Sequence, residues 1–476
     1  MGSKRKSARV AATLVGLFFG FWMVSSAAAQ GPPASGSEVL PLPKPEQIQG
    51  NRCPLDLGAA LARVAGYNPQ VAFAAARYRE ACARLEAARV LWLPSIRAGV
   101  SYNKHEGTLQ EANGDVLDAS RSALATGMGV GASGTGSPAV PGLLATFRLT
   151  DAIYQPLIAG NAAAAQREAA RTTTQELLLE TALAYLDLLA ALQRQSIAEA
   201  TLQNAQQLAD LTAAFAASGQ GQQSDADRAR AELMLRKNDV TRAEEDVRVV
   251  SARLTELLHW DPTIVVQPEE PALAPIELVD QQVPLTELLA RGLSCRPELA
   301  ESRYLVAEAA QRYRRERTAP LLPSTLLGIS YDGFGGGPGD DVANFRDRFD
   351  LDALAYWEVR NFGLGERAAR NEARARCDQA RFRQVQLMDQ VAREVSQAHA
   401  QVQSRRGQIA EAERAVQAAS ESYRRNLERI RNGQGLPIEA LQAIQALDAA
   451  WREYLRAVLS YDEAQFRLER ALGWPM

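Results

Sequence analysis

A seven-residue repeat of apolar side chains between residues 366 and 432 is the feature that most constrains this chain. The stretch contains no proline and only one glycine, Gly407, so nothing in it forces a helix to stop. The repeat runs through Met388, Val395, Val402, Ile409, Val416, Tyr423 and Ile430. A second apolar set lies three residues further on, at Val391, Ala398, Ala412 and Ala419. Such a heptad predicts a helix of roughly 100 Å that needs partner helices along its whole length.

The first thirty residues have the order of a secretory signal peptide. Basic residues at 4–9 precede a short apolar run at 10–24, and small residues follow up to Ala29. The apolar run is too short for a typical membrane-spanning helix, and the small residues are typical of a cleavage site. We therefore predict a signal peptide at 1–29, cut after Ala29, and an exported mature chain.

Charge and cysteine content narrow the possible partners. The formal net charge is −3, and four of the cations lie in the predicted signal peptide, so the mature chain is mildly acidic and nucleic acid is not expected as a partner. Beyond the signal peptide no apolar run reaches eighteen residues, so no membrane-spanning helix is expected. The cysteines, Cys53, Cys82, Cys295 and Cys377, form no C-x-x-C motif, and isolated thiols or one structural disulfide are both compatible with their spacing.

The mature sequence is a tandem duplication. Residues such as Leu57, Pro69 and Arg84 recur 228 positions later as Leu285, Pro297 and Arg312, and Gly219-Gln220-Gly221 recurs 214 positions later as Gly433-Gln434-Gly435. We predict a flexible, proline-containing linker at 30–54, a first repeat at 55–260, a proline-rich crossover at 261–283 and a second repeat at 284–474.

Each repeat predicts two consecutive helices, a strand pair, a long helix, a glycine turn and a returning antiparallel helix. The long helices are expected between Gly160 and Gly219 and between Gly363 and Gly433, the second longer by eleven residues, or three helical turns. Ser224 with Asp227 resembles a capping box at the start of the first returning helix, and Pro437 suits the first turn of the second.

Four segments alternate between apolar and polar residues, which is typical of β-strands with one apolar face. The apolar sets are Ile96, Ala98, Val100 and Tyr102; Leu143, Ala145, Phe147 and Leu149; Leu327, Ile329 and Tyr331; and Phe349, Leu351, Ala353, Ala355 and Trp357. The stretches 105–141 and 333–341 are expected to be the hairpin loops. In a transmembrane barrel the apolar face would meet lipid, and the other face would line the interior with Arg97, Arg148, Arg348, Asp350 and Asp352.

Four strands cannot close a barrel. A sheet edge exposed to lipid leaves backbone groups unpaired at several kcal/mol each, so several chains must share one barrel. Two chains would give eight strands, which their own side chains fill, whereas three would give twelve and leave a passage. The sequence therefore predicts a homotrimer in which a helical barrel continues a transmembrane β-barrel.

Several motifs in this order resemble the TolC-like outer-membrane efflux proteins. They are Asn68-Pro69-Gln70, Arg296-Pro297-Glu298-Leu299, Leu93-Pro94, Leu322-Pro323, the glycine turns followed by Ser224-Asp225 and Ile438-Glu439, and Ala471-Leu472-Gly473. The resemblance covers residues 55–473. It implies a trimeric channel-tunnel with a β-barrel of four strands per chain in the outer membrane and an α-barrel of antiparallel helical hairpins in the periplasm. It also implies passive exit of substrates with a periplasmic adaptor and an inner-membrane pump of the RND, ABC or MFS type, as in tripartite efflux or type I secretion.

The same resemblance suggests roles for the periplasmic tip. Asp225 and Glu439 lie where acidic rings can narrow the channel, although acids in the first turn of a helix also simply complement its dipole. The turn glycines Gly219, Gly221, Gly433 and Gly435 would contact the adaptor. Gly435 stands where a basic tip residue occurs in such proteins, and Arg429 or Arg431 could take its place.

Two other classes of function compete with a channel. Catalysis is not expected, because His105, His259 and His399 have no second ligand at metal spacing, and neither a nucleophile elbow nor a phosphate loop occurs. No cofactor or metal is expected. An exported coiled-coil scaffold of the periplasm is the remaining alternative; it explains the helices and the signal peptide, but not the duplicated strand pairs.

Overall fold

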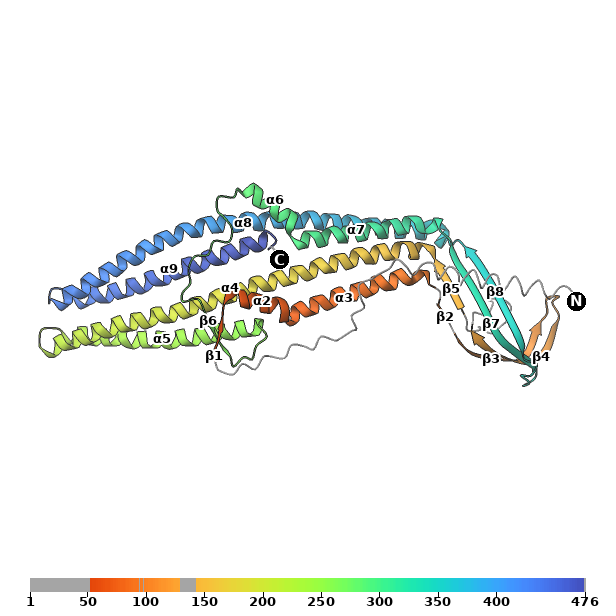
Figure 1. The fold of residues 1–476 in the computed structure, drawn as a ribbon, viewed down its shortest axis with the longest axis horizontal. Coiled ribbons are helices and arrows are strands. Elements are labelled where there is room, and N and C mark those ends of the chain that lie inside the picture. Colours follow the sequence, from red (N-terminus) through yellow and green to blue (C-terminus); the bar gives the residue numbers. More distant parts are fainter. Residues whose placement is uncertain (1–51, 94, 97, 129–142, 475–476) are drawn as a thin grey trace. The chain divides into compact units, whose positions relative to one another are not determined.

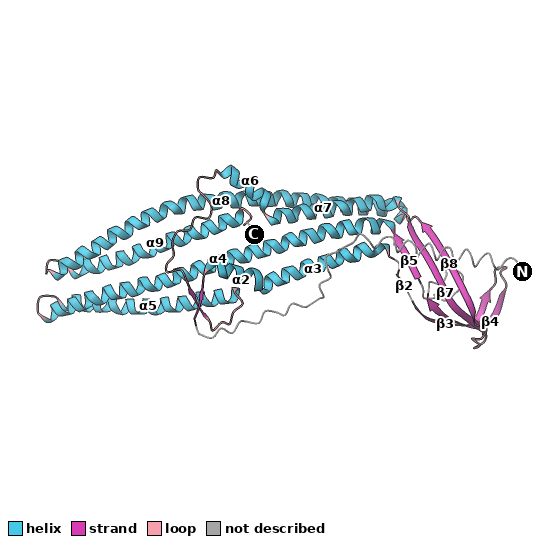
Figure 2. Ribbon diagram, in the orientation of Figure 1, coloured by secondary structure: helices cyan, strands magenta, loops and turns pink. Residues whose placement is uncertain are grey.

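The structure, a computed structural model, describes residues 52–93, 95–96, 98–128 and 143–474. Helices dominate this part of the chain, and the strands of the larger sheet gather beyond the ends of the long helices (Figure 2). The predicted signal peptide, most of the linker, and Arg97 lie outside the described residues.

The order of elements repeats, as the duplicated sequence pattern predicts (Figure 1). The helices of the first half are α2 (Leu57–Tyr67), α3 (Pro69–Arg89), α4 (Leu149–Ala217) and α5 (Gln223–Leu257). Those of the second half are α6 (Leu285–Cys295), α7 (Pro297–Thr318), α8 (Leu364–Arg431) and α9 (Pro437–Ala471). Short 3-10 turns, η1 (Val90–Trp92), η2 (Ala319–Leu321) and η3 (Arg360–Gly363), lie where helices meet strands.

The two long helices are almost equal in length, which contradicts the predicted difference of eleven residues. Helix α4 has 69 residues and α8 has 68, because α4 begins at Leu149 and runs through Pro156 and Gly160. Contacts from α7 hold these first turns: the Arg315 guanidinium bonds Asp151 Oδ1 at 2.6 Å, and the Tyr154 and Thr318 hydroxyls lie 3.0 Å apart. Tertiary contacts therefore override the local signals of a proline and a glycine.

The heptad of α8 is buried along much of its length and changes partner along the way. Val391, Val395 and Val402 are at most 1% exposed and pack with residues of α6, α7 and α9. Helix α7 accompanies the first part of α8 and α9 the second, so the expected partner helices are present. Met388 is an exception: it is 42% exposed and does not belong to this buried cluster.

The two helical hairpins, α4–α5 and α8–α9, are joined by polar contacts as well as by apolar packing. The Thr201 hydroxyl of α4 donates to Asp448 Oδ1 of α9 at 3.2 Å. Arg236 of α5 lies 3.8 Å from the other oxygen of Asp448 and 2.8 Å from Glu232 of its own helix. Since Glu232 and Asp448 are buried, this network fixes the register between the hairpins.

The larger sheet contains more strands than the sequence predicts. Its strands are β2 (Ser95–Ile96), β3 (Ala98–Gln110), β4 (Val116–Met128), β5 (Leu143–Arg148), β7 (Ser324–Pro338) and β8 (Arg346–Tyr356). The expected loop 105–141 is wrong in its first part, because β3 extends to Gln110 and pairs with β4. Leu149 and Trp357, predicted as strand residues, belong to α4 and to the segment after β8.

Across its middle rows the sheet is nevertheless four strands wide. Near the helices Ile96, Leu143, Ile329 and Leu351 form one row of directly paired residues across β2, β5, β7 and β8. Further out Ala98, Met128, Tyr331 and Phe349 form the next such row, with β3 and β4 in place of β2 and β5. Directly paired residues share a face, so the register brings the four predicted apolar sets to the same face of one sheet.

The crossover between the halves is tied to α9 by buried polar groups. Strand β6 (Val265–Pro268) pairs in parallel with β1 (Arg52–Leu55). Further along, the Ile276 N–H donates to Asp462 Oδ1 at 2.8 Å, and the Val279 N–H donates to Gln465 at 3.1 Å. Asp462 is fully buried and its second oxygen has no hydrogen-bond partner. The burial raises the pKa of Asp462 to about 7.

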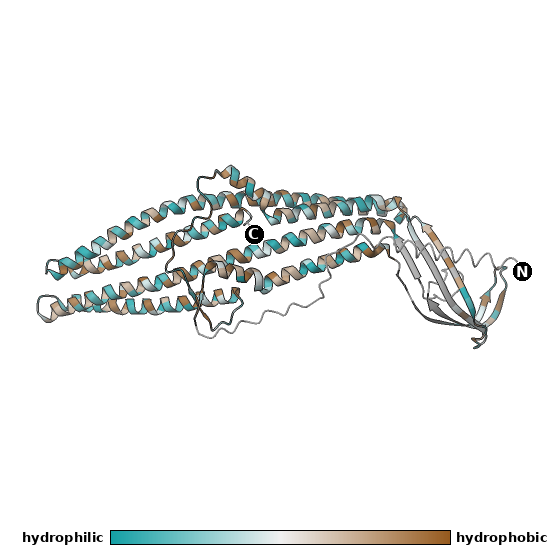
Figure 3. Ribbon diagram, in the orientation of Figure 1, coloured by the Kyte–Doolittle hydropathy of each residue, from teal (hydrophilic) through white to brown (hydrophobic). Residues whose placement is uncertain are grey.

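Within the described residues, no helix is both long and apolar enough to cross a membrane. Hydrophobic and hydrophilic residues alternate along each long helix (Figure 3). All four cysteines are free thiols, so of the two predicted possibilities the structure has isolated thiols.

Asp462 predicts how stability depends on pH. Because its pKa is higher in the folded chain than in the unfolded one, the folded state holds the proton more tightly, and stability falls as pH rises from about 4 to about 7. Asp462→Asn keeps the oxygen that accepts from Ile276 and removes this penalty, which is at most about 4 kcal/mol at pH 8. Thermal unfolding in detergent at pH 5 and pH 8 should show that this substitution stabilises the protein mainly at pH 8. An equal effect at both pH values would contradict the assignment.

Candidate functional site

The two turns that join the long helices to the returning helices have the same backbone geometry. The first turn spans 218–222 and the second 432–436 (Figure 1). In the first, the N–H groups of Gln220 and Gly221 both donate to the carbonyl of Phe215 at 3.0 Å. These bonds satisfy a carbonyl that the end of α4 would otherwise leave unpaired.

The second turn repeats this pattern at the positions 214 residues later. The N–H groups of Gln434 and Gly435 donate to the Arg429 carbonyl at 2.9 and 3.1 Å. Gly219 and Gly433 both have φ of +73°, a left-handed conformation that strains residues with a side chain. The duplicated glycines are therefore required by the shape of the turn.

At the other glycine of each turn, the neighbouring residues leave little room for a side chain. A Cβ on Gly221 would lie 3.1 Å from Phe215 Cβ, and one on Gly435 would lie 3.0 Å from the backbone nitrogen of Ile430. All four predicted turn glycines thus have a structural role, and their contact with an adaptor stays a prediction.

The two predicted acids occupy equivalent places but have different partners. Asp225 and Glu439 are each the third residue of their helix. Asp225 Oδ1 lies 3.7 Å from Arg228 on its own helix, whereas Glu439 Oε2 lies 3.0 Å from Arg429 at the end of α8. The second turn is therefore bridged by an ion pair between its two helices, and the first is not.

Of the two arginines that the sequence left open as basic tip residues, the structure pairs Arg429 with the acid. Arg431 is exposed and makes no ion pair with any described residue. At the offset of 214 residues, the position in the first repeat that corresponds to Arg429 is Phe215. The sequence alone therefore shows that the first turn lacks the arginine that pairs with the acid in the second turn.

The helix starts beside the turns agree only partly with the prediction. Pro437 is the first residue of α9, as expected. The capping box at Ser224 is wrong, because the N-cap of α5 is Gln222, two residues earlier, and Gln222 makes no side-chain capping bond. The Ser224 hydroxyl instead donates to Gln222 Oε1 at 3.3 Å.

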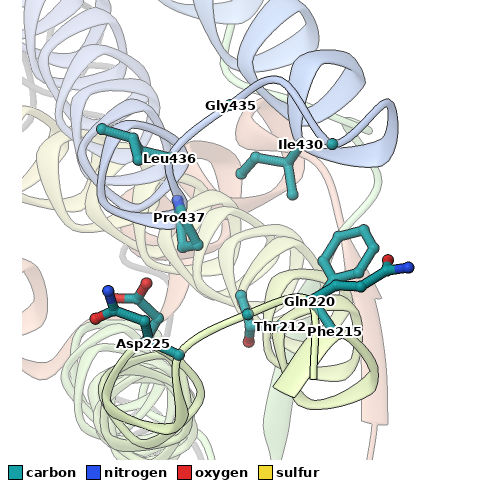
Figure 4. A pocket seen from close by; sticks show the side chains of 11 residues that line it. Thr212, Phe215, Gln220, Asp225, Ile430, Gly435, Leu436 and Pro437 are labelled. Atoms are coloured by element: carbon teal, nitrogen blue, oxygen red, sulfur yellow. The ribbon is translucent and has the colours of Figure 1, made fainter. Parts of the chain in front are cut away.

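A pocket of about 440 Å³ lies between the two turns. Figure 4 shows Thr212, Phe215 and Gln220 of the first hairpin facing Ile430, Leu436 and Pro437 of the second, with Asp225 at its margin. Leu436 is 60% exposed. The sequence analysis did not single out Phe215 and Leu436. An apolar residue beside each glycine turn is the sequence feature that could have identified them.

The predicted lumen residues of the sheet fall on one face where they are described. Arg148 pairs with Ser324, which pairs with Tyr356, and Arg348, Asp350 and Asp352 follow at even spacings along the same strand as Tyr356. The Arg348 guanidinium lies 5.3 Å from the centre of the Phe334 ring. Whether this face lines a channel stays a prediction.

No protein-family profile matches this sequence, and no curated protein matches it. The structure, in contrast, is similar to solved outer-membrane channels. The outer-membrane channel OprN has a TM-score of 0.71 and 20% identity over 88% of this chain and 90% of its own.

Two further solved structures show the same likeness. VceC of Vibrio cholerae has a TM-score of 0.71 and 18% identity over 88% of this chain and 96% of its own. The CmeC channel of Campylobacter jejuni has a TM-score of 0.73 and 15% identity over 88% of this chain and 85% of its own. The chain therefore has the fold of these channels, and the resemblance that the sequence motifs indicated is confirmed at the level of the fold.

Substitution of glycine by alanine should have opposite effects on stability in the turn and within helix α8. Gly433→Ala should destabilise the protein by about 1 kcal/mol, because alanine strains a left-handed residue. Gly407→Ala is the matched control: Gly407 is exposed within α8 with open space around its Cα, so alanine should stabilise the helix by about 1 kcal/mol. Thermal unfolding of the two variants checks this, and a neutral Gly433→Ala would contradict the role of the turn.

Proposed function

We propose that this chain is one subunit of a trimeric outer-membrane channel that gives substrates a passive exit from the periplasm to the exterior. The observation that carries the proposal is the sheet, which is four strands wide and has its predicted apolar sets on one face. Among the described strands, the outer edges of β3 and β8 have no partner. In lipid these edges must pair with other copies, and three copies give a twelve-stranded barrel with room for a passage.

The helices supply the rest of the conduit. Helices α3, α4, α7 and α8 pack in this order as a layer beside the strands, and α5 and α9 return along α4 and α8. Three such layers would form a helical barrel that continues the β-barrel into the periplasm. The likeness to outer-membrane channels supports this placement.

We further propose that the tips dock to a periplasmic adaptor and act with an inner-membrane pump of the RND, ABC or MFS type. The pocket between the turns, with Phe215 and Leu436, offers a surface for such a contact. The predicted signal peptide at 1–29 would direct the chain out of the cytoplasm. The carboxylates of Asp225 and Glu439 would form rings around the tip opening.

Cell fractionation separates the channel from a periplasmic scaffold. The proposal expects the protein in the outer membrane, as a trimer that needs detergent for extraction and that conducts ions in a planar bilayer. A rod that is extracted with salt, stays soluble without detergent and has no conductance would reject the channel in favour of the scaffold.

Neutralising the tip acids should change ion selectivity. The double variant Asp225→Asn/Glu439→Gln removes six carboxylates from a trimer, so its preference for cations should fall, as measured by reversal potentials across a salt gradient. Asp227→Asn is the matched control, since Asp227 lies in the same turn of α5, is exposed, and pairs with Arg230 at 3.6 Å. Equal selectivity in the double variant and the wild type would exclude the acids from the conduction path.

A further inference from the structure

Positive charge accumulates where α7 and α8 meet the strands. Segments 312–317 and 360–383 together contain eleven arginines and four acidic residues, although the whole chain has a net charge of −3. Helices α7 and α8 pack against each other, so the two segments form one surface. A charge excess of this size in an acidic chain requires an explanation.

Three acids near this end of the helices are already occupied. Arg315 pairs with Asp151 at 2.6 Å and with Glu316 at 2.7 Å. Arg360 pairs with Glu316 at 3.4 Å and with Glu366 at 3.2 Å. These two arginines therefore compensate most of the charge of the three acids. Arg312, Arg376 and Arg381 each pair with an acid on their own helix, and the other six arginines of the two segments make no ion pair with a described residue.

Three of the remaining arginines share one face of α8. Arg367, Arg370 and Arg374 follow the i, i+3, i+7 spacing, are exposed, and make no ion pair with any residue that the structure describes. Arg367 lies at the end of the first turn of α8, where the helix dipole favours acids and disfavours cations, and Arg370 and Arg374 lie beyond the reach of the dipole. The stability of α8 thus does not explain them.

A strained and fully exposed aromatic residue stands just before these arginines. Asn361 and Phe362 both have left-handed backbone conformations, with φ of 52° and 54°. Phe362 is 100% exposed, and Trp357 and Leu364 are 61% and 68% exposed. A strained backbone that presents an apolar ring to the surroundings destabilises the folded chain and therefore points to a binding role.

The same order of side chains occurs at other junctions between helix and strand. Arg89, at the end of α3, is followed by Trp92 and Leu93, which are 48% and 63% exposed. Arg317, at the end of α7, is followed by Leu321, which is 73% exposed. From strand to helix, exposed apolar side chains come first, and arginines without an ion pair to any described residue come second.

We propose that this band binds the phosphates of anionic phospholipids in the leaflet that faces the helices. Aromatic and aliphatic side chains would enter the boundary of the acyl chains, and the arginines would reach the phosphates, which guanidinium groups bind with two hydrogen bonds. Arg367 and Arg370 lie roughly 5 and 9 Å along α8 from Leu364, within reach of a headgroup layer about 5 to 8 Å thick. The inference rests on the proposed function, because it requires a chain inserted in the outer membrane.

The test uses the full chain in detergent with added phosphatidylglycerol or phosphatidylcholine. Native mass spectrometry of the wild type should show about tenfold greater retention of phosphatidylglycerol. The triple variant Arg367→Gln/Arg370→Gln/Arg374→Gln should lose most of this preference while its conductance and ion selectivity stay unchanged. Arg242→Gln/Arg248→Gln/Arg393→Gln removes three exposed charges elsewhere on the helices and should keep it.

Two results would overturn the inference. The first is a wild-type protein that conducts ions but retains the two lipids equally. This result would reject the lipid site without any variant and would leave the proposed channel function standing. The other is a triple variant that retains phosphatidylglycerol but has altered ion selectivity, since the arginines would then face the conduction path. A chain that never enters a membrane would instead reject the proposed function itself.

Discussion

Unpaired backbone at the edges of the sheet is the constraint on which the rest of this structure depends. The described strands form a wall four strands wide, and no described segment of the chain covers the outer edges of β3 and β8. Water can satisfy such edges, but lipid cannot. An apolar face suits lipid, but open sheet edges do not, so other copies of the chain must pair with these edges and complete the wall. The helical layers below must then follow the same symmetry.

The helical layer is built from two copies of the same arrangement of helices, one from each half of the chain. Each half contributes one helix of nearly 70 residues, α4 or α8, and two shorter helices that pack against it. Corresponding helices of the two halves match in length to within one residue. The buried network around Asp448 holds the two hairpins in register, and the crossover is tied to α9 through Asp462. The tips can then differ in charge while sharing one backbone geometry, because Arg429 replaces Phe215.

Periodicity and duplication predicted most of this fold, and tertiary pairing decided the rest. The heptad of α8, the glycine turns and the alternating faces follow from local spacing, which a sequence displays directly. Strand β4 was missed because Ser120, Ser122 and Gly127 are typical of loops, and it is a strand because β3 and β7 pair with it. The early start of α4 likewise depends on contacts from α7. At the tips, Asp225 and Glu439 could be predicted, but the ion pair to Arg429 depends on how the turn brings two helices together.

Hydrogen exchange at the two open edges tests the central claim most directly. The account predicts that outward-facing amides of β3 and β8, which have no partner among the described strands of one chain, exchange slowly in the protein extracted from the outer membrane, because neighbouring copies pair with them. The amides between β7 and β8, which are paired within the chain, provide the internal reference. Rapid exchange at both edges, with the β7–β8 amides protected, would show that the sheet stays open and would contradict a shared barrel.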